Sequence, residues 1–530
     1  MQQSHIPFRN TGYFSKLMCD YLDENQDVKT FYNRFPNLEN FKNQIEEKQG
    51  VFTLQSRLAL ASVIQKQYQH IERSELTLQN IELLKLENTF TITTGHQLNL
   101  FTGPLYFLYK ITSAINLAKA LKQNYPEFNF VPVYWMATED HDFEEINYFN
   151  FKGKKVQWNR ASGGAVGELP TEGLQDVFDV FSSELGHTKN AEVLKTLFKR
   201  SYLEHDNLAD ATRFLANELF AEYGLTIIDA NEKALKKEFV PIMKDELLNQ
   251  TSYNSVAKTN EALSEKYNIQ VNPREINLFY IHENIRERIV FEDDIYKVLN
   301  TKITWSKSEI QEVLLEHPER FSPNVIMRPL YQEVILPNLC YIGGGGEIAY
   351  WFQLKDYFNT VKVPFPVLLL RNSVLIQTDS QHKKLQNLNI SKEDIFLKQS
   401  SFINKKVREI SNIDIDFSTQ KKYLEQQFED LYALAKQTDK SFLGAVKAQE
   451  IKQLKGLDNL EKRLLKAQKN KLSDQVFRMT EIQNELFPSQ SLQERNTNFS
   501  EFYLEHGKEL IPNLLESLEP LKGEFLILSL

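Results

Sequence analysis

The chain has 530 residues, 42% of them hydrophobic and 25% charged, a composition that is typical of globular proteins and excludes a disordered or fibrous chain. Its net charge of −9 argues against a general nucleic-acid-binding protein, because phosphate binding requires a basic surface. Cys19 and Cys340 are its only cysteines, which excludes a disulfide scaffold and a multi-cysteine zinc site and favours a reducing compartment.

No segment of the sequence predicts secretion or insertion into a membrane. The first residues, MQQSHIPFRNTGYF, are polar and lack the apolar core of a signal peptide. No run approaches the ~18 apolar residues of a membrane-spanning helix, and the apolar run PFPVLLL at 364–370 has the length of a buried strand. We therefore expect a cytoplasmic protein without a membrane partner.

Predicted helices and strands alternate along much of the chain. Residues 13–88 have a mostly helical, amphipathic pattern, and the β-branched segment at 89–95 predicts a strand. Pro104 suits the first turn of a helix that would run to about Lys122. The further predicted elements are a strand at 128–137, a strand at 225–230 with a helix at 231–248, a strand at 334–342 with a helix at 347–358, and a strand at 364–370. Because nearly continuous apolar strands are typical of parallel sheets, we predict an α/β fold with a doubly wound parallel sheet.

Two segments interrupt this alternation, and we interpret 151–222 and 251–325 as insertions. The second contains a predicted hairpin, NLFYI followed by RIVFE. The core is then discontinuous and comprises 1–150 with its N-terminal helices, 223–250 and 326–378.

The chain is predicted to become helical from about residue 379. Apolar residues recur there at steps of three and four with one phase slip, which is typical of a short coiled coil. They are Leu457, Leu460, Leu464, Ala467, Leu472, Val476, Met479, Ile482 and Leu486. We assign 379–490 to a helical coiled-coil arm and 491–530 to a tail, whose last residues, EFLILSL, predict a strand that returns to the main body.

The predicted arm is basic although the chain is acidic. Residues 440–475 contain nine Lys or Arg and four Asp or Glu, a local charge of +5 that leaves −14 for the rest of the chain. Three interpretations are open: a solvated helix face, an arm that docks on an acidic partner subunit, and a contact with a phosphate-bearing ligand.

The first candidate site is TTGHQLNLFTGPLYFLYK at 93–110. A predicted strand runs into a loop and then into a helix N-terminus, where backbone N–H groups and the helix dipole attract anions. The candidate binding residues are Thr94, Gly95, His96, Gln97, Thr102 and Gly103. Lys110 lies two turns into the helix and is not included. The segment lacks the GxGxxG and P-loop patterns, and the alternative is a helix capped by Thr102 and Gly103.

The second candidate site is TEDHDFEEI at 138–146, directly after a predicted strand. Open α/β sheets bind ligands at such strand ends, and carboxylates there can hold a substrate amine, act as a general base or bind Mg²⁺. The candidate catalytic residues are Glu139, Asp140, His141 and Asp142. The alternative is a capping box of Asp142 and Glu145 at a helix start. No zinc is expected, because its sites use dedicated His and Cys ligands.

The third candidate site is MRPLYQEVILPNLCYIGGGGEIAYW at 327–351. Four consecutive glycines are entropically costly to order, which favours a loop that wraps a ligand over a plain turn. An arginine such as Arg328 can clamp a carboxylate or a phosphate. The candidate binding residues are Arg328, Gln332, Gly343, Gly344, Gly345, Gly346 and Glu347, although Glu347 alternatively compensates the helix dipole.

Two further features are interpreted as structural. Ser306-Lys307-Ser308 faintly resembles the KMSKS loop of class I aminoacyl-tRNA synthetases, but Ser306 and Glu309 fit a capping box that opens a helix at 307–316. Cys340 is expected to be a buried small hydrophobe, because no activating base adjoins it in the sequence.

Taken together, three segments resemble one known family. TTGHQLNLFTGPLYFLYK, VPVYWMATEDHDFEEI and RPLYQEVILPNLCYIGGGGEIAYW, in this order and at these spacings, are similar to the bacterial BshC family, the assigned cysteine ligases of bacillithiol biosynthesis. The resemblance extends over nearly the whole chain and includes LFPSQSLQER at 486–495. His96 stands where a second glutamine is common in that family, and GGGG stands where GGPGE-like sequences are frequent.

The resemblance implies a Rossmann-like core with connecting-peptide insertions and a coiled-coil arm that mediates homodimerisation. It also implies a ligase that adds L-cysteine to glucosaminyl-malate by forming an amide, which yields bacillithiol. Because the family's core is related to class I synthetases, an ATP-dependent route with Mg²⁺ is expected.

The resemblance also suggests roles for the three candidate sites. The loop at 94–102 would bind phosphate or another anion, and the carboxylates at 139–142 would hold an amine, with His141 as the acid or base. Arg328 and the glycines at 343–346 would close on carboxylate or phosphate groups.

Two other classes of function remain open. One is a non-catalytic ligand-binding or scaffold protein that dimerises through its coiled coil. The other is a synthetase-like protein that binds tRNA through the basic arm, against which the acidic body, the missing KMSKS loop and the lack of an anticodon-type domain argue. No P-loop lysine supports the ATP step.

Overall fold

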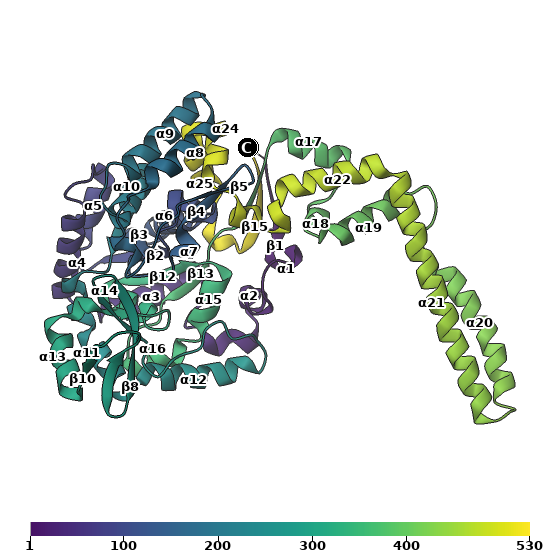
Figure 1. Ribbon diagram of the computed structural model, residues 1–530, viewed down its shortest axis with the longest axis horizontal. Helices are drawn as coiled ribbons and strands as arrows, with labels where there is room; N and C mark the ends of the chain where they lie inside the picture. Colours follow the sequence, from purple (N-terminus) through teal and green to yellow (C-terminus); the bar gives the residue numbers. More distant parts are fainter. Residues whose placement is uncertain (1) are drawn as a thin grey trace.

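A five-stranded parallel sheet forms the centre of the molecule in the computed structural model, which describes residues 2–530 (Figure 1). Its strands lie in the order β13-β12-β2-β3-β6. In chain order they are β2 (Thr89–His96), β3 (Asn129–Met136), β6 (Thr226–Asp229), β12 (Asn338–Gly343) and β13 (Val367–Leu370). This order is that of a doubly wound, Rossmann-like sheet, which confirms the predicted fold class. It reverses between β2 and β12, so a ligand crevice is expected beyond the carboxyl ends of these two strands.

The helices before and between the first strands begin where the sequence supplies capping side chains. Ser15, Asn37, Thr53 and Ser74 each accept a hydrogen bond from a backbone N–H of the following turn. They start the helices α2 (Lys16–Leu22), α3 (Leu38–Gln49), α4 (Leu54–Gln67) and α5 (Glu75–Leu83). The chain then forms α6 (Tyr106–Asn124), which packs against β2 and β3.

The segment before β12 differs from the prediction. The strand expected at 334–342 starts only at Asn338, because its first residues end the helix α14 (Arg328–Ile335). Pro337 explains the difference, since the residue before a proline is disfavoured in a helix. The helix predicted after the glycines is interrupted and consists of α15 (Gly345–Phe352) and α16 (Lys355–Val361).

Both predicted insertions are folded. The first begins at the last residue of β4 (Tyr148–Phe151) and carries β5 (Lys154–Gln157), α8 (Leu174–Leu185), α9 (Lys189–Tyr202) and α10 (Leu208–Phe220). The core then contributes α11 (Lys233–Asn249). The second carries α12 (Thr251–Ser264), β7 (Leu278–His282), β8 (Ile285–Glu292), β9 (Ile295–Val298), β10 (Thr304–Trp305), α13 (Lys307–Glu316) and β11 (Phe321–Pro323). Its strands form an antiparallel sheet in the order β10-β9-β8-β7-β11. The predicted hairpin, β7–β8, and the predicted capping box of Ser306 and Glu309 are confirmed.

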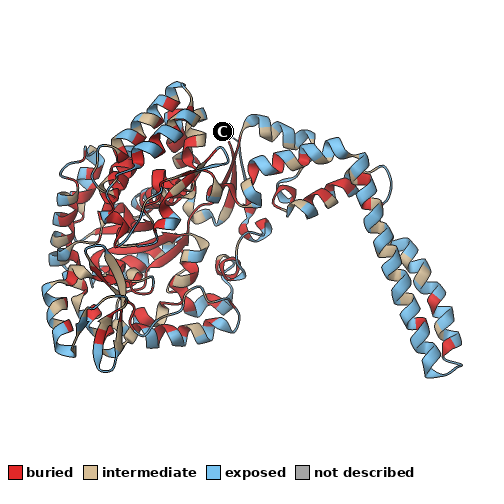
Figure 2. Ribbon diagram, in the orientation of Figure 1, coloured by how far each residue is buried: buried red, intermediate tan, exposed pale blue. Residues whose placement is uncertain are grey.

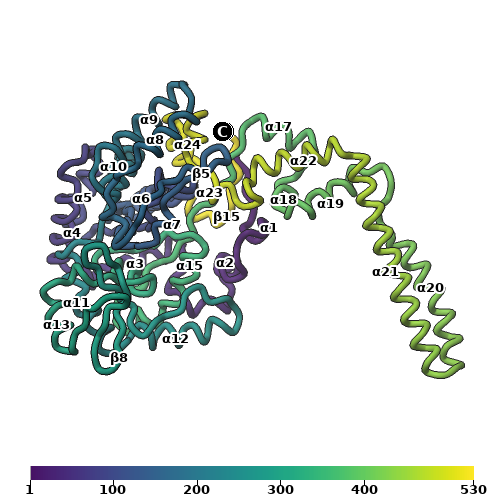
Figure 3. Tube along the Cα trace, in the orientation of Figure 1, coloured from purple at the N-terminus to yellow at the C-terminus, as the bar shows by residue number. Residues whose placement is uncertain are grey.

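The two ends of the chain lie side by side (Figure 3). The strand β15 (Glu524–Ser529) pairs antiparallel with β1 (Gln2–Pro7) and parallel with β14 (Val374–Gln377). The predicted terminal strand is therefore confirmed, and it joins a three-stranded sheet with the N-terminus rather than the central sheet.

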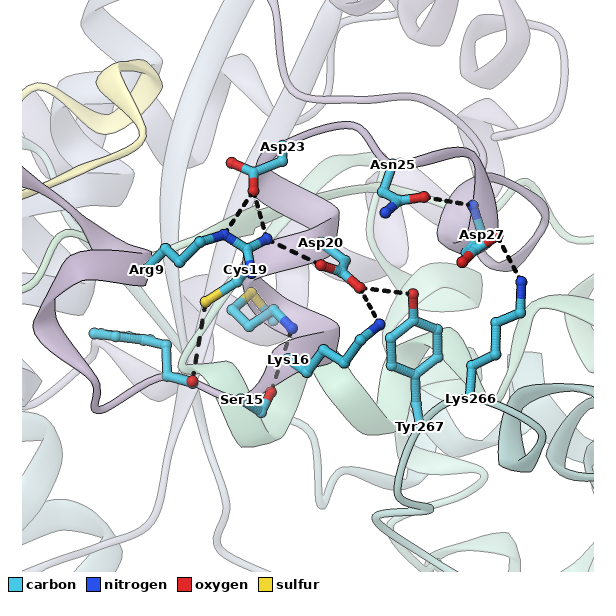
Figure 4. Close-up of polar contacts among 12 residues, drawn as sticks. Arg9, Ser15, Lys16, Cys19, Asp20, Asp23, Asn25, Asp27, Lys266 and Tyr267 are labelled. Carbon is cyan, nitrogen blue, oxygen red and sulfur yellow. Dashed lines mark hydrogen bonds and ion pairs between the residues drawn. The ribbon is translucent and has the colours of Figure 1, made fainter. Parts of the chain in front are cut away.

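The first helices are fastened to the second insertion through Asp20 (Figure 4). Its carboxylate accepts hydrogen bonds from Arg9 at 2.9 Å, from Lys16 at 2.5 Å and from the Tyr267 hydroxyl at 3.0 Å. Burial alone would raise the pKa of Asp20, but these donors hold it below its ordinary value. Because α2 also packs against α15, this anchor supports the helix that follows β12.

The C-terminal part is helical and extends away from the body (Figure 1). Its helices are α17 (Asp379–Asn387), α18 (Lys392–Ile395), α19 (Gln399–Ile410), α20 (Ser418–Ala435), α21 (Lys440–Lys471), α22 (Ser473–Leu486), α23 (Gln493–Asn496), α24 (Phe499–His506) and α25 (Leu510–Ser517). The helices α20 and α21 form an antiparallel hairpin whose surface is mostly exposed (Figure 2). Within residues 2–530, no helix is both long enough and apolar enough to span a bilayer.

The predicted apolar stripe of the arm is confirmed in its second half and wrong in part of its first. Met479, Ile482 and Leu486 are buried, whereas Leu460 is 52% exposed. In the first half Leu465 is buried instead. The stripe shifts because α21 packs against α20 near the tip of the arm and against α19 closer to the body.

Candidate functional site

A cavity of about 620 Å³ lies where the strand order reverses, between the carboxyl ends of β2 and β12. Three segments of the core and one insertion line it. The core contributes Gly95, His96, Gln97, Tyr106, Lys110, Trp135, Glu139, Asp140, His141, Arg328, Tyr341, Glu347 and Tyr350, and the second insertion contributes Arg274, Phe279, Arg286 and Arg288. The three separate sequence segments that contain the candidate sites therefore meet at one cavity.

An ion pair joins the two sides of the crevice. Lys110 of α6 donates to Glu347 Oε1 at 2.5 Å and to the carbonyl oxygen of Gly95 at 2.6 Å. The Tyr341 hydroxyl donates to Glu347 Oε2 at 2.6 Å. Burial alone would raise the pKa of Glu347, but Lys110 and Tyr341 hold it below its ordinary value. Glu347 is therefore a carboxylate with both oxygens engaged, and Lys110 is positioned by two acceptors.

The guanidinium of Arg328 lies in the wall of the cavity beside Gly95. Its hydrogen bonds go to neutral groups, the Gln332 side-chain oxygen and the Tyr350 hydroxyl, both at 3.3 Å. The ideal position of a Cβ atom on Gly95 lies 3.8 Å from Arg328 Nη1. Arg328 therefore has no carboxylate hydrogen-bonded to it among the described residues and is available to an anionic ligand.

The carboxylates after β3 have different surroundings. Glu139 pairs with the buried ammonium of Lys236, which occupies one of its oxygens. Asp140 accepts the backbone N–H of His141 at 2.7 Å on Oδ1 and the amide of Gln97 at 3.0 Å on Oδ2. Asp140 lines the cavity without a cationic side chain of Lys or Arg bonded to it in residues 2–530, so it can accept a substrate ammonium.

His141 is oriented by the second insertion. Arg286 Nη1 lies 2.6 Å from His141 Nδ1. Since a guanidinium can only donate, Nδ1 must accept, and the proton of a neutral His141 ring is on Nε2. Arg286 itself stacks on Phe279 with its central carbon 4.2 Å from the ring centroid. In this arrangement His141 offers a proton from Nε2 rather than a free basic nitrogen.

His96 lines the cavity and is buried, with its Nε2 atom unpartnered among the described atoms. Burial lowers its pKa well below the usual value, and the nearby positive charge of Lys110 adds to the effect. The imidazole is therefore neutral at physiological pH. Its ring packs between Tyr106 and Phe107, with centroid distances of 5.5 and 5.0 Å.

The loop after β2 is held in a strained conformation by distant parts of the chain. Phe101 and Thr102 both have positive φ angles, of 47° and 68°, which cost energy for residues with side chains. The Phe101 N–H donates to the Tyr202 hydroxyl oxygen at 2.8 Å, and the Asn498 amide of the C-terminal part donates to the Phe101 carbonyl oxygen, also at 2.8 Å. The alternative in which Thr102 caps the helix is wrong, because α6 has no side-chain cap.

A second cavity of about 310 Å³ adjoins the first. Gln97 and Tyr106 line both cavities and form the partition between them. The remaining walls come from the loop after β2, from β4 and from the C-terminal part: Asn99, Gly103, Pro104, Glu145, Tyr148, Phe149, Asn150, Arg495 and Asn496.

Comparison with known proteins assigns this architecture to a family. Residues 1–372 match the model of the N-terminal Rossmann-like domain of the bacillithiol biosynthesis protein BshC, and residues 374–530 match that of its C-terminal coiled-coil domain. The chain belongs to the BshC family.

Several BshC relatives match over nearly their full length. A protein of Flavobacterium johnsoniae is 63% identical over 99% of both chains, and one of Christiangramia forsetii is 58% identical over 100% of this chain and 99% of the relative. A protein of Cytophaga hutchinsonii is 37% identical over 97% of this chain and 96% of the relative. All three bear the provisional name cysteine ligase BshC.

Some residues predicted for this BshC site lie beside the large cavity rather than in its wall. Thr94 donates to the Ile342 carbonyl oxygen at 2.8 Å, which ties β2 to β12. The Gln332 side chain lies behind Arg328, Gly103 lines the smaller cavity, and Gly345 faces Phe14 and Met18. The other predicted residues outside the wall of the large cavity are Thr102, Asp142, Gly343, Gly344 and Gly346.

The alternative capping box of Asp142 and Glu145 is wrong. Asp142 occupies the N-cap position of α7 (Phe143–Ile146), but its side chain makes no cap hydrogen bond. Glu145 instead accepts a hydrogen bond from the Gln97 amide at 2.8 Å, so its carboxylate holds the side chain that separates the two cavities. Cys340 is buried as expected, and burial raises the pKa of its thiol well above the usual value.

Sequence reasoning missed several residues of the BshC cavity. The predicted place of Lys110, two turns into its helix, excludes it from the site, yet α6 starts only at Tyr106. Helical side chains lean toward the N-terminus, and the long stem of Lys110 reaches back to Gly95. The arginines of the second insertion had no local signal, because only the docking of β7–β8 on the core brings them to the site. Across residues 2–530, no group of three or more His, Cys, Asp and Glu side chains is arranged to hold a metal ion.

Proposed function

We propose that this BshC protein is a cysteine ligase that joins L-cysteine to glucosaminyl-malate through an amide bond and so forms bacillithiol. The provisional names of its relatives support this activity. The observation that carries the proposal is the cavity at the reversal of the strand order, where Asp140 and the cationic groups of Lys110 and Arg328 line one space. Such a space suits small substrates that carry both amines and carboxylates.

The chemistry of amide formation matches these groups. A carboxylate must first be activated, the amine must attack the activated carbonyl carbon, and the amine must then lose a proton. Asp140 would bind the substrate ammonium and take up the proton whose loss frees the amine lone pair for the attack. Lys110 and Arg328 would stabilise negative charge on the activated group, and His141 would donate a hydrogen bond from Nε2 to the departing group.

We propose ATP as the activating co-substrate. Phosphate chains bind at loops after parallel strands and at helix N-termini, and the loop between β2 and α6 is such a place. Mg²⁺ is commonly held by one or two carboxylates and by substrate phosphates. Asp140, together with the free oxygen of Glu139, is the group that a nucleotide-borne Mg²⁺ would meet.

We further propose that the protein is a homodimer whose subunits contact one another through the arm. The hairpin of α20 and α21 buries only a small apolar cluster around Phe428, Ala435 and Val446. Apolar side chains on the same two helices stay exposed: Leu431, Leu434, Phe442, Leu443, Ile451 and Leu460. Apolar surface of this kind marks interaction sites, and Leu434→Asp should convert the dimer to a monomer in light-scattering measurements while the thermal midpoint of the body stays unchanged.

A turnover assay with a matched pair of variants tests the catalytic proposal. Asp140→Asn should reduce the rate of amide formation at least 100-fold with an unchanged thermal midpoint, whereas Asp176→Asn, an exposed residue of α8, should leave the rate unchanged. Cysteine, ATP and glucosaminyl-malate should each raise the thermal midpoint of the wild type. Full activity of Asp140→Asn would remove Asp140 from the mechanism, and no shift with any substrate would favour a scaffold.

A further inference from the structure

One wall of the large cavity is formed by arginines of the second insertion. In the β7–β8 hairpin, Phe279 is paired with Arg288 and Ile281 with Arg286. Directly paired residues and residues two apart on a strand share a face of the sheet, so both arginines lie on the face that carries Phe279. Arg274, which precedes β7, lines the same cavity.

These arginines differ in what they contact. Arg286 binds His141 at 2.6 Å and the Ser322 hydroxyl at 3.3 Å, and it stacks on Phe279. The guanidinium groups of Arg274 and Arg288 have no hydrogen bond or ion pair with any other residue that the structure describes. Arg286 is therefore built into the wall, while Arg274 and Arg288 present free guanidinium groups.

The acids of the cavity do not compensate these two charges. Glu347 is bound by Lys110 and Tyr341, and Glu139 by Lys236. Asp140 is bound by Gln97 and a backbone N–H. Two arginines without acidic partners on one wall suit a ligand that itself carries two negative charges.

The proposed acceptor substrate carries two negative charges and also one positive charge. Glucosaminyl-malate carries two carboxylates on its malate moiety and an amine on its sugar. A guanidinium binds a carboxylate through two parallel N–H···O bonds. The phosphate chain of a nucleotide instead suits backbone N–H groups at loops after parallel strands, and neither arginine belongs to such a loop.

We propose that Arg274 and Arg288 bind the two malate carboxylates of the acceptor, and that the amine of the same molecule is thereby directed toward Asp140. The arginines are then the residues that distinguish glucosaminyl-malate from other amino sugars. This inference rests on the proposed function, because it assumes that glucosaminyl-malate is the acceptor.

The test measures the kinetics of arginine variants with two acceptors, glucosaminyl-malate and an amino sugar that lacks the malate carboxylates. Arg274→Gln and Arg288→Gln should each raise the KM for glucosaminyl-malate about 10- to 100-fold, with the KM values for cysteine and ATP unchanged. With methyl glucosaminide, which has the amine but no malate, both variants should react at the same low rate as the wild type. Arg73→Gln, an exposed residue between α4 and α5, is the matched control and should behave as the wild type with both acceptors.

Other outcomes would overturn the inference. A raised KM for ATP in the variants would assign the arginines to the phosphate chain of the nucleotide. An equal loss of rate with both acceptors would show that the arginines are structural, and a lowered thermal midpoint would show the same. Wild-type kinetics in both variants, with bacillithiol still formed, would refute the role of the arginines and leave the ligase activity standing. Calorimetry of glucosaminyl-malate binding distinguishes failure of the proposed function from failure of the inference. If the wild type forms no product and does not bind this compound, the proposed function is refuted and the inference with it.

Discussion

The ammonium of Lys110 lies 2.5 Å from the carboxylate of Glu347, and this contact links the helix after β2 to the helix after β12. These are the two strands between which the strand order reverses. The ion pair therefore spans the crevice in which doubly wound sheets bind their ligands. It also fixes the ammonium beside Gly95, where the backbone borders the cavity.

Removing one partner of this ion pair should destabilise the protein. Lys110→Met leaves Glu347 as a poorly solvated carboxylate with Tyr341 as its only donor, and we expect a loss of about 3 kcal/mol in the free energy of unfolding. The double variant Lys110→Met/Glu347→Gln should recover part of that loss because no charge remains unpaired. Urea unfolding measures the free energy of unfolding of both variants. If the single variant is as stable as the wild type, the pair does not hold the crevice together.

His96 should make the stability of the protein sensitive to acid. Its pKa is lowered well below 6.5 in the folded protein, first by burial and then by Lys110. The unfolded chain therefore takes up a proton below pH 6.5 that the folded protein does not, so stability falls as the pH falls. Between pH 6.5 and 5.5 the wild type should lose about 1 kcal/mol more than His96→Gln does.

Urea unfolding at these two pH values measures the difference. The exposed His70 provides the control, because His70→Gln should keep the wild-type pH dependence. An equal pH dependence in the wild type and in His96→Gln would contradict the assignment of the acid sensitivity to the buried imidazole.

Gly95 and Gly346 should respond in opposite ways to alanine. A Cβ atom on Gly95 would lie 3.2 Å from the Tyr341 hydroxyl, whereas one on Gly346 would have no atom within 4 Å. We expect Gly95→Ala to reduce turnover at least tenfold and stability by about 1 kcal/mol. Gly346→Ala should keep its turnover and gain up to about 1 kcal/mol as a helical alanine. Turnover and unfolding of both variants test this, and full activity of Gly95→Ala would show that the backbone needs no close approach there.

The stability of the C-terminal part should depend on one buried ion pair. Arg371 donates to Glu494 at 2.8 Å, and Glu494 also accepts the Val374 N–H at 3.1 Å. Arg371→Met leaves a buried carboxylate unpaired and should cost about 3–5 kcal/mol, while Arg371→Met/Glu494→Leu should recover much of it. Thermal unfolding and limited proteolysis measure the effect. Wild-type protease resistance of the single variant would exclude this role.

Much of the fold was predictable from local patterns. The apolar strands β2, β3 and β13 and the hairpin β7–β8 are marked by their composition, and the capping box of Ser306 and Glu309 by its spacing. Errors arose where a single residue or a tertiary contact overrides a local pattern. Pro337 delays the start of β12, and the change of packing partner along α21 moves the buried stripe away from Leu460.

The candidate site was predictable only in part. The strand ends identified Gly95 and Asp140, because residues there converge in a doubly wound sheet. Arg328 was identified by the ability of a guanidinium to clamp a carboxylate or a phosphate. The other features of the site depend on contacts between segments far apart in the sequence. The loop after β2 is shaped by Asn498, some 400 residues later, and the free guanidinium of Arg288 reaches the cavity through the docking of an insertion.

The central claim is that the cavity beside Asp140 joins cysteine to glucosaminyl-malate. The most direct test is mass analysis of a reaction that contains the purified protein, L-cysteine, glucosaminyl-malate, ATP and Mg²⁺, with each component omitted in turn. We predict that bacillithiol forms only in the complete mixture, together with AMP or ADP in equal amount. A complete mixture in which the protein forms no bacillithiol would contradict the ligase activity, and bacillithiol formed without ATP would contradict the ATP-dependent route.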